Sequence, residues 1–377
     1  MPTHVTTDDL IRLRLASQLL REGELRSPAD VARHLLATQA QDFAAACWAL
    51  GLRAPGTTQL DVLTALERGE ILRSWPMRGT LHFVAPEDLG WMLAVTTPRM
   101  IAGLATRNRQ LELDDSAFER AREVVVNALS GGGTIGRAEL MQEFEAHGIR
   151  TAGQRGYHLI YYLAQTGTLC WGPPHKAQQS LVLLDEWVTS PRELGPEESL
   201  REFLVRYLDG HGPATLRDFA WWSKVTITSA KAALALARTE LVELDLDGTS
   251  YWMTAKAADA TSAAPPAREA RDAVRVLPGF DEYLLGYQDR SLVLPPEFAQ
   301  RIVPGGNGIF LPTIVSRGRV VGTWRRASAA RGVTGQAQAF TRLTVRESVG
   351  FERAIRDYAR FVGSTAPAGQ RRQRAAG

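Results

Sequence analysis

Cysteine is scarce in this chain, with two residues among 377, and other features that would narrow its class are missing. Cys47 and Cys170 stand far apart in apolar surroundings, which indicates reduced core residues and no disulfide framework. No apolar run approaches the about 20 residues needed to cross a bilayer. The N-terminal segment MPTHVTTDDL has neither the basic nor the apolar region of a signal peptide. We therefore expect a cytoplasmic protein with no membrane association.

Sequence signatures of metal and nucleotide sites are missing as well. The chain has no CxxC, HExxH or Walker sequence. The glycine-rich stretch GGGTIGRAEL at 131–140 follows an expected helix rather than a strand, so it lacks the context of a phosphate-binding loop. No metal ion, organic cofactor or obligate protein partner is predicted.

Lysine is also rare, because only four of the 44 basic residues are lysine and the other 40 are arginine. The net charge of +3 and the pI of about 9.0 indicate a nucleic-acid partner only weakly. Arginine binds phosphate with two parallel hydrogen bonds, but the codon usage of a GC-rich genome accounts for the same bias. Charge alone therefore does not decide the partner.

The order of the expected elements repeats along the chain. In the middle, apolar residues at helical spacing predict helices over 115–129, 136–148 and 151–167, the last with Thr151 as N-cap, and a hairpin over 168–187. Three helices followed by a hairpin is the winged-helix plan, in which the third helix enters a DNA groove and the hairpin contacts the backbone.

The same order is expected on either side of this segment. Downstream helices over 197–212, 215–223 and 227–240 precede a hairpin over 240–254, whose turn is Asp247–Gly248. Upstream the expected elements are helices over 6–20, 27–41 and 58–68 and a hairpin over 71–84 that turns at Gly79.

These patterns predict a mainly α fold with β elements, divided into several domains. The expected divisions are winged-helix domains over 1–113, 114–192 and 193–257, a linker over 258–269, a C-terminal β-barrel-like domain over 270–363 and a basic disordered tail over 364–377.

Four motifs give the chain a resemblance to a known family. They are ATQAQ (37–41), RGTLHFV (78–84), HGPATLRDFAWWS (211–223) and LPGFDEYLLGYQDR (277–290). In this order the chain resembles the winged-helix family that includes the bacterial alkylpurine DNA glycosylases AlkZ and YcaQ. The resemblance implies three tandem winged helices around a channel for double-stranded DNA, a C-terminal β-barrel and a catalytic Q-x-Q or Q-x-D motif.

Gln39 and Gln41 fall on that motif in its Q-x-Q form, which the resemblance associates with enzymes that unhook DNA crosslinks made by natural-product alkylators. A purine alkylated at N7 already carries positive charge, so it leaves without protonation, through an oxocarbenium-like sugar cation. Two neutral amides that hold one water could then suffice, by positioning catalysis. We therefore predict a monofunctional DNA glycosylase acting on alkylated or crosslinked purines, with no lyase step because no motif positions a lysine.

The alternative for the two glutamines is a place on a helix surface, because Gln is a good helix former. A second QAQ at 336–338 lies outside any recognised motif and is a reminder that three-residue motifs recur by chance.

Further candidates lie on the expected hairpins. His82 could orient a water, contact phosphate or support a glutamine, or it could be a satisfied strand histidine. Arg73 and Arg78 flank the same turn and could bind DNA phosphates, as could His175 and Lys176 at the tip of the second hairpin. Each of these four is explained equally well by an ordinary surface position.

Other conspicuous residues have structural explanations. Trp221 and Trp222 could stack on bases, but core packing is the simpler reading. The paired carboxylates Asp281, Glu282 and Asp289 in LPGFDEYLLGYQDR suggest acid–base work, but ion pairs with a structural role, beside Arg290, are the expected explanation. Asp281 and Asp289 are the next catalytic candidates if the glutamines are inert. The alternative function for the whole chain is a non-catalytic winged-helix DNA-binding or regulatory protein.

Overall fold

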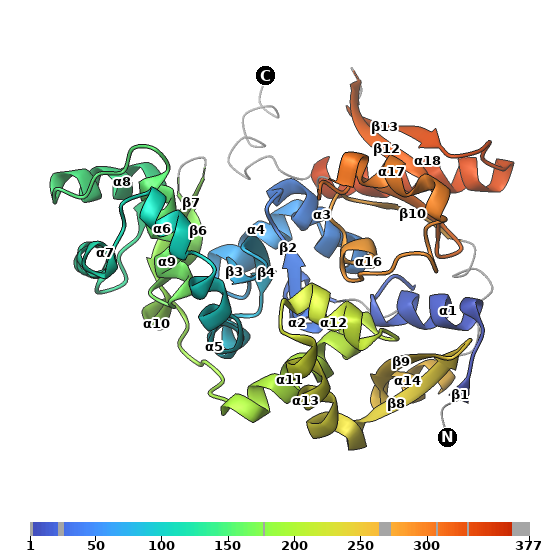
Figure 1. Ribbon diagram of the computed structural model, residues 1–377. Coiled ribbons are helices and arrows are strands. Elements are labelled where there is room, and N and C mark those ends of the chain that lie inside the picture. Colours follow the sequence, from blue (N-terminus) through green and yellow to red (C-terminus); the bar gives the residue numbers. More distant parts are fainter. Residues whose placement is uncertain are drawn as a thin grey trace, which may run out of the picture.

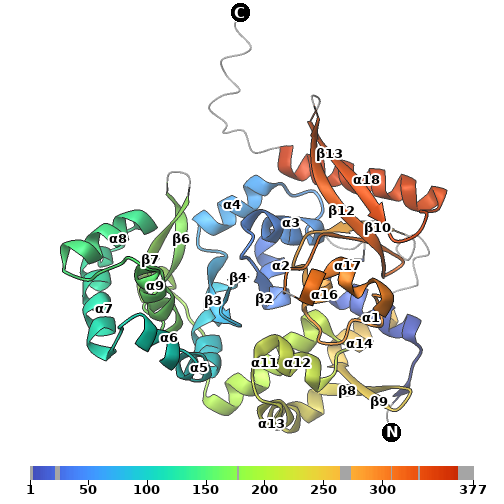
Figure 2. The ribbon, with the colours of Figure 1, turned by 45° about the horizontal axis from the view of Figure 1, so that its top comes forward.

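The computed structural model describes residues 3–21, 26–175, 178–263, 273–306, 308–329 and 332–363. It has a mixed α/β architecture in which three sheets are surrounded by helices. A lobe that contains α7–α9 and the β6–β7 hairpin stands at one end, and the sheet of β10–β13 with α18 stands at the other (Figures 1 and 2). The segment α2–α4 with β2–β4 lies between them.

The first two predicted hairpins belong to one six-stranded sheet rather than to separate wings. Its strand order is β2-β4-β3-β6-β7-β5, and β3 pairs with β6 through Arg73 and Trp171. The strands are β2 (Ala37–Gln39), β3 (Leu72–Met77), β4 (Thr80–Val84), β5 (Ile135–Gly136), β6 (Leu169–His175) and β7 (Gln178–Leu183). The division of the chain into three winged-helix domains therefore stays a prediction.

The third predicted hairpin forms as expected. Strands β8 (Leu241–Leu246) and β9 (Thr249–Thr254) flank Asp247 and Gly248, whose φ angles of 52° and 80° suit a type I′ turn. Strand β1 (Thr3–His4) adds to β8 in parallel, so the start of the chain is tied to this hairpin.

The C-terminal β-barrel prediction is wrong for the described residues, which form an open four-stranded antiparallel sheet. Its order is β10 (Val274–Leu277), β11 (Thr313–Ser316), β12 (Arg319–Ala329) and β13 (Gly332–Ala339). The apolar stripe of α18 (Val345–Gly363), which includes Phe351, Ile355 and Tyr358, packs in one core with Val276, Ile314 and Trp324 of the sheet. A helix therefore covers the face that closure of a barrel would have buried.

The N-terminal half contains ten helices among the described residues. They are α1 (Thr7–Ser17), α2 (Pro28–Leu35), α3 (Phe43–Arg53), α4 (Gln59–Glu67), α5 (Pro86–Ala102), α6 (Ala105–Gln110), α7 (Asp115–Leu129), α8 (Arg137–Ala146), α9 (Arg155–Gln165) and α10 (Leu184–Trp187). The predicted N-cap Thr151 is wrong, because α9 begins at Arg155 after Gln154, whose φ is 74°.

The remaining helices are α11 (Pro196–His211), α12 (Leu216–Ser223), α13 (Ile227–Ala237), α14 (Ala255–Ala263), α16 (Glu282–Leu285) and α17 (Ala299–Ile302), with short 3-10 turns at Arg238–Glu240, Pro296–Phe298 and Pro304–Gly306. Helix α14 corrects the predicted linker, since 258–263 continue a helix that starts directly after β9. Residues 264–269 and the predicted tail 364–377 lie outside the described residues. Within the described ranges, no helix is both long and apolar enough to span a membrane.

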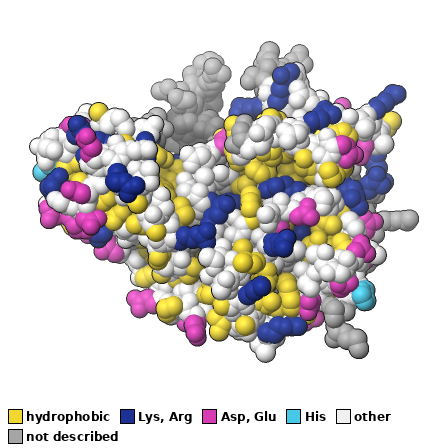
Figure 3. Space-filling view, in the orientation of Figure 1, with side chains coloured by type: hydrophobic (Ala, Val, Ile, Leu, Met, Phe, Trp, Pro, Cys, Tyr) yellow, Lys and Arg dark blue, Asp and Glu magenta, His cyan; other side chains and the backbone are white. Residues whose placement is uncertain are grey.

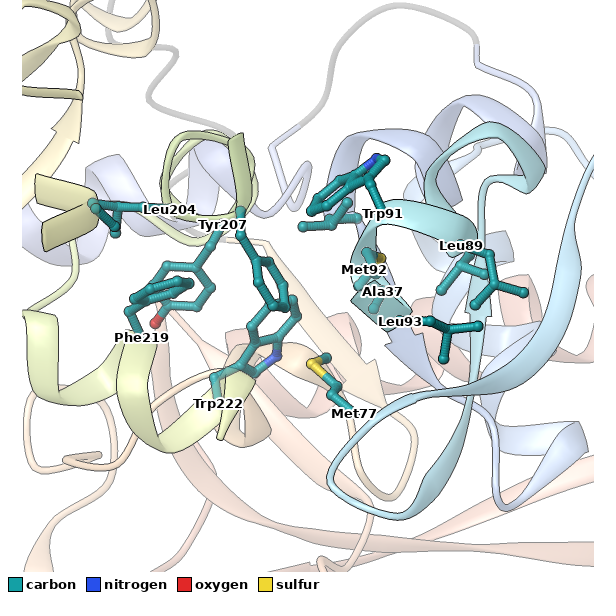
Figure 4. Close-up of a cluster of buried hydrophobic side chains, with 14 of the residues drawn as sticks. Ala37, Met77, Leu89, Trp91, Met92, Leu93, Leu204, Tyr207, Phe219 and Trp222 are labelled. Atoms are coloured by element: carbon teal, nitrogen blue, oxygen red, sulfur yellow. The ribbon is translucent and has the colours of Figure 1, made fainter. Parts of the chain in front are cut away.

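One aromatic core fixes the position of α11 and α12 against the first hairpin. Figure 4 shows Tyr207 of α11 and Phe219 and Trp222 of α12 facing Met77 of β3 and Met92 of α5, all buried in one cluster. Close packing of rings at such a junction makes it rigid. The core therefore brings the motif at 211–223 next to the motif at 78–84.

Candidate active site

Gln39 lies at the end of an edge strand, not on a helix. Helix α2 ends at Leu35, and Leu36 with φ 63° reverses the chain so that Ala37–Gln39 pair with β4. The prediction of one helix over 27–41 is therefore wrong. In the antiparallel register Gln39 is directly opposite His82, so their side chains project from the same face of the sheet.

His82 is fully buried, and both of its ring nitrogens are engaged. Nδ1 lies 2.8 Å from the Thr80 carbonyl oxygen and Nε2 lies 2.9 Å from Nη2 of Arg78. Burial and the nearby Arg78 cation lower the pKa of His82 to about 3. The ring is therefore neutral, with Nδ1–H donating to Thr80 and Nε2 accepting from Arg78, which suits the supporting role among those predicted for His82.

A buried carboxylate, Glu282 of α16, closes the same cluster. Oε1 accepts a hydrogen bond from the backbone N–H of Gln39 at 3.1 Å, and Oε2 accepts one from Trp222 Nε1 at 2.8 Å. His211 Nε2 is 3.3 Å from Oε2, and Arg78 Nη2 is 3.8 Å from Oε1. Burial by itself raises the pKa of Glu282, but the His211 hydrogen bond and the Arg78 charge outweigh it and lower the pKa to about 2.

Sequence reasoning missed Glu282 and His211 as neighbours of the glutamine motif. The only signal was that Glu282 lies in the motif at 277–290 and His211 in the motif at 211–223, both of which carried the family resemblance. The fold joins these two motifs with ATQAQ and RGTLHFV around one strand end.

The side-chain carbonyl of Gln39 is an unsatisfied acceptor in this cluster. Its Oε1 is buried and, among the residues that the structure describes, has no hydrogen-bond partner. An orphaned acceptor beside a charged, hydrogen-bonded network costs stability unless water or a ligand binds it. The position of Gln39 is therefore suited to holding a polar molecule.

Gln41 has different surroundings. It is exposed, its Oε1 accepts a hydrogen bond from the backbone N–H of Leu81 at 3.3 Å, and it lines a cavity of about 560 Å³. Aromatic walls from Phe43, Tyr157 and Trp171 line the same cavity, between the first and second hairpins. No hydrogen bond joins the two glutamine amides in the described chain.

Arg73 fixes the backbone between the two glutamines. Its Nε and Nη2 donate to the Ala40 carbonyl at 3.0 and 2.8 Å, and its Nη1 donates to Gln179 Oε1 at 3.2 Å. This half-buried guanidinium is thus engaged inside the protein, and its contact with a DNA phosphate stays a prediction. Arg78, with 8% of its side chain exposed, is likewise engaged mainly inside the protein.

The other predicted residues have other surroundings or lie outside the described chain, except Trp222, which binds Glu282. His175 ends β6 opposite Gln178, whereas Lys176 lies outside the described residues. Asp281 forms a buried two-bond ion pair with Arg53, which confirms the structural interpretation, and Asp289 is exposed. Trp222 is a core residue, as expected.

Comparisons with known proteins identify the family of the chain. A family described as DNA glycosylase AlkZ-like matches residues 32–361, so the chain belongs to the AlkZ-like DNA glycosylase family. It is 27% identical to an interstrand DNA cross-link repair glycosylase of Streptomyces sahachiroi over 325 residues, which cover 82% of this chain and 85% of that protein. Its fold is similar to that of Streptomyces sahachiroi DNA glycosylase AlkZ, with a TM-score of 0.79, 24% identity and coverage of 96% and 99% of the two chains.

Membership of this family decides between the two functions considered from the sequence. The chain is a DNA glycosylase, an enzyme that acts on N-glycosyl bonds, rather than a regulator that only binds DNA.

Proposed function

We propose that this enzyme hydrolyses the N-glycosidic bond of cationic N7-alkylated purines in double-stranded DNA, and that it unhooks interstrand crosslinks made by a natural-product alkylator. Gln39 and Gln41 hold the attacking water, and no strand-cleaving step follows. The observation that supports this most is the buried, unpartnered Oε1 of Gln39 beside neutral His82 and ionised Glu282.

The reaction needs no general acid. The water oxygen forms a bond to C1′, the bond from C1′ to the purine nitrogen breaks, and its electron pair cancels the positive charge of the purine. The water proton leaves to solvent. Because the leaving group is already cationic, placement of the water supplies most of the catalysis.

The different surroundings of the two amides suggest different roles for Gln39 and Gln41. The backbone N–H of Gln39 donates to Glu282, and the side-chain Oε1 of Gln39 is a free acceptor for the water. Gln41 stands at the edge of the aromatic cavity, which has room for a purine and its adduct. Because a glutamine carbonyl has two lone pairs, Gln41 keeps an acceptor site beside its bond to Leu81.

The crosslink part of the proposal comes from the relative. The Streptomyces sahachiroi protein is named as an interstrand cross-link repair glycosylase, and this chain covers 85% of it. A crosslinked base is tethered to the opposite strand, so it is hard to extrude fully. A water held at a strand end would reach C1′ without that extrusion.

The direct test measures base release in single turnovers, at saturating enzyme, from duplexes with N7-methylguanine or an N7–N7 crosslink. We expect Gln39→Ala to slow release about 100-fold or more and Gln41→Ala about 10-fold, because each removes a group that fixes the water. DNA affinity and the unfolding midpoint stay near wild type.

The second QAQ provides the matched control. Gln336→Ala and Gln338→Ala alter exposed positions on β13 and should leave the excision rate at saturation unchanged. Wild-type rates in the Gln39→Ala, Gln41→Ala double variant would refute the assignment of the glutamines. Release from the methyl adduct alone, with no unhooking, would refute the crosslink part.

A further inference from the structure

A second cavity lies on the other side of Arg78 from the glutamine motif. It has a volume of about 480 Å³ and opens between α5 and the turn from α12 to α13. Its described lining comprises Arg78, Val95, Thr96, Pro98, Arg99, Met100, Gly103, Leu104, Leu200, Ser223, Lys224, Val225, Thr226 and Ser229.

The charges of this cavity are all of one sign. Arg78, Arg99 and Lys224 line it, and none of its described lining residues is acidic. Burial, and then the Arg78 and Arg99 charges, lower the pKa of the Lys224 ammonium group. Glu282 lies 3.8 Å from Arg78, but no acidic residue of the described lining faces Arg99 and Lys224 in the cavity. Like charges that share a cavity without a facing anion destabilise the free protein, which favours a role in binding an anion.

Hydrogen-bond donors surround the same space. Helix α13 begins here, with Thr226 as N-cap, and the first amides of a helix attract anions. Ser223, Thr226 and Ser229 belong to the lining, where the Ser223 hydroxyl donates to the Phe219 carbonyl and the Thr226 and Ser229 hydroxyls are bonded to each other. Nη1 of Arg78 is buried and has no hydrogen-bond partner among the described residues, on a side chain that is 8% exposed. Cations, helix amides and an unsatisfied guanidinium are the groups that phosphate requires.

We propose that this cavity binds a backbone phosphate of the DNA, with Arg99 and Lys224 as its direct cationic contacts and Arg78 at its floor. The inference rests on the proposed function only in that the enzyme acts on duplex DNA. Figure 3 shows Lys and Arg side chains gathered around α12 and between it and α5, where acidic side chains are few.

Arg78 links this phosphate to the chemistry. Its Nη2 binds His82, which lies opposite Gln39 in the sheet. A phosphate held on the other side of Arg78 would therefore fix the DNA strand beside the strand end that carries the glutamine motif. Arg78 is a positioning residue in this arrangement.

The test measures binding of undamaged duplex DNA over a range of salt concentrations, so it does not depend on base release. We expect Lys224→Gln and Arg99→Gln each to weaken binding about 5- to 10-fold and to reduce the slope of log affinity against log salt by about 1. Lys231→Gln on the exposed face of the same helix α13 is the matched control and should change neither.

The stability of the free protein separates this role from a structural one. Lys224→Gln removes like-charge repulsion and also a contact of Nζ with the Trp221 ring, 5.7 Å from its centroid, so its melting temperature should stay close to that of the wild type. An unchanged salt slope, an equal loss in Lys231→Gln, or weaker binding that follows a lower melting temperature would each overturn the proposal.

Inorganic phosphate, added at constant ionic strength against chloride, distinguishes the two sources of the anion. Competition with DNA that disappears in Lys224→Gln supports a backbone phosphate in the cavity. Suppose that inorganic phosphate raises the melting temperature of the wild type but not of Lys224→Gln, while both proteins bind DNA equally well. The cavity then holds a free phosphate, and the DNA assignment is wrong. If Gln39→Ala abolishes excision but binds DNA normally, the proposed function stands whatever the outcome here.

Discussion

Asp281 and Glu282 are adjacent in the chain, yet their carboxylates belong to two different regions. Asp281 is paired with Arg53 at 2.8 Å through both oxygens, and every nitrogen of Arg53 has a partner, with Gln18 and Ala49 supplying the others. Glu282 instead joins Gln39, Trp222 and His211, next to the orphaned acceptor of Gln39.

The difference separates a group that maintains the fold from one that prepares a site. Buried polar networks in which every group is satisfied mainly specify structure, whereas an unsatisfied member marks a place for water or substrate. By this criterion the Arg53 region is structural, and the Glu282 region is the candidate functional site.

The largest effect is expected from breaking the structural pair. Asp281→Asn removes the charge that compensates the buried Arg53 guanidinium, and we expect a loss of about 3–5 kcal/mol in the free energy of unfolding. Denaturant unfolding measures it. The excision rate per folded molecule should remain close to wild type, and a loss of excision without a loss of stability would reverse the proposed roles of the two carboxylates.

Glu282→Gln should lower excision as well as stability, because it removes a buried charge that faces Arg78. The amide has one carbonyl acceptor in place of two carboxylate oxygens, so it can accept from Gln39 or from Trp222 but not at both positions. It also lacks the charge that faces Arg78 and His211, so the Gln39 backbone becomes less well held. We expect single-turnover excision to fall about 100-fold, which corresponds to about 2.7 kcal/mol, with DNA affinity maintained. Normal excision by a folded Glu282→Gln variant would remove Glu282 from the site.

Acid should act on the same region. The pKa of His82 is lowered from 6.5 to about 3 and that of Glu282 from 4.5 to about 2. As the pH falls, each group is therefore protonated in the unfolded chain at a higher pH than in the folded protein. Stability is therefore full above about pH 6.5 and falls as the pH drops, first through His82 and below pH 4.5 through Glu282 as well. At pH 4.5 we expect the stability lost through His82 to be on the order of 2 kcal/mol.

A single variant checks this assignment. In His82→Gln the loss of stability between pH 6.5 and 4.5 should shrink, as measured by denaturant unfolding at each pH. An equally steep loss in that variant would show that another group carries the proton linkage.

The sequence predicted those parts of the fold that local signals determine. The predicted helices over 6–20, 27–41 and 215–223 do start at Thr6, Ser27 and Thr215, where the structure has complete capping boxes, and the Asp247–Gly248 hairpin turn forms as expected. These features need only residues three or four positions apart.

The prediction errors occur where contacts between segments far apart in the sequence determine the structure. Residues 37–39 continue a helical pattern, but pairing with β4, more than 40 positions later, makes them a strand. The junction of two hairpins in one sheet and the cover of the C-terminal sheet by α18 have the same origin. For the candidate site, the motif identified Gln39, but only the fold brings in Glu282, which is 243 positions away.

The smallest effect is expected at Asp289, the third carboxylate of the same motif and the remaining alternative as a catalytic acid. Its side chain is exposed, and its Oδ1 accepts a hydrogen bond from the backbone N–H of Ser291 at 2.9 Å. An exposed carboxylate in a turn makes a small contribution, so Asp289→Asn should change the free energy of unfolding by less than about 0.5 kcal/mol. Base release should equal that of the wild type, which makes this variant the control for both Asp281→Asn and Glu282→Gln. If Asp289→Asn instead slowed excision 10-fold or more at saturating enzyme, an acid–base group outside the buried cluster would be required, and positioning by neutral amides would no longer suffice.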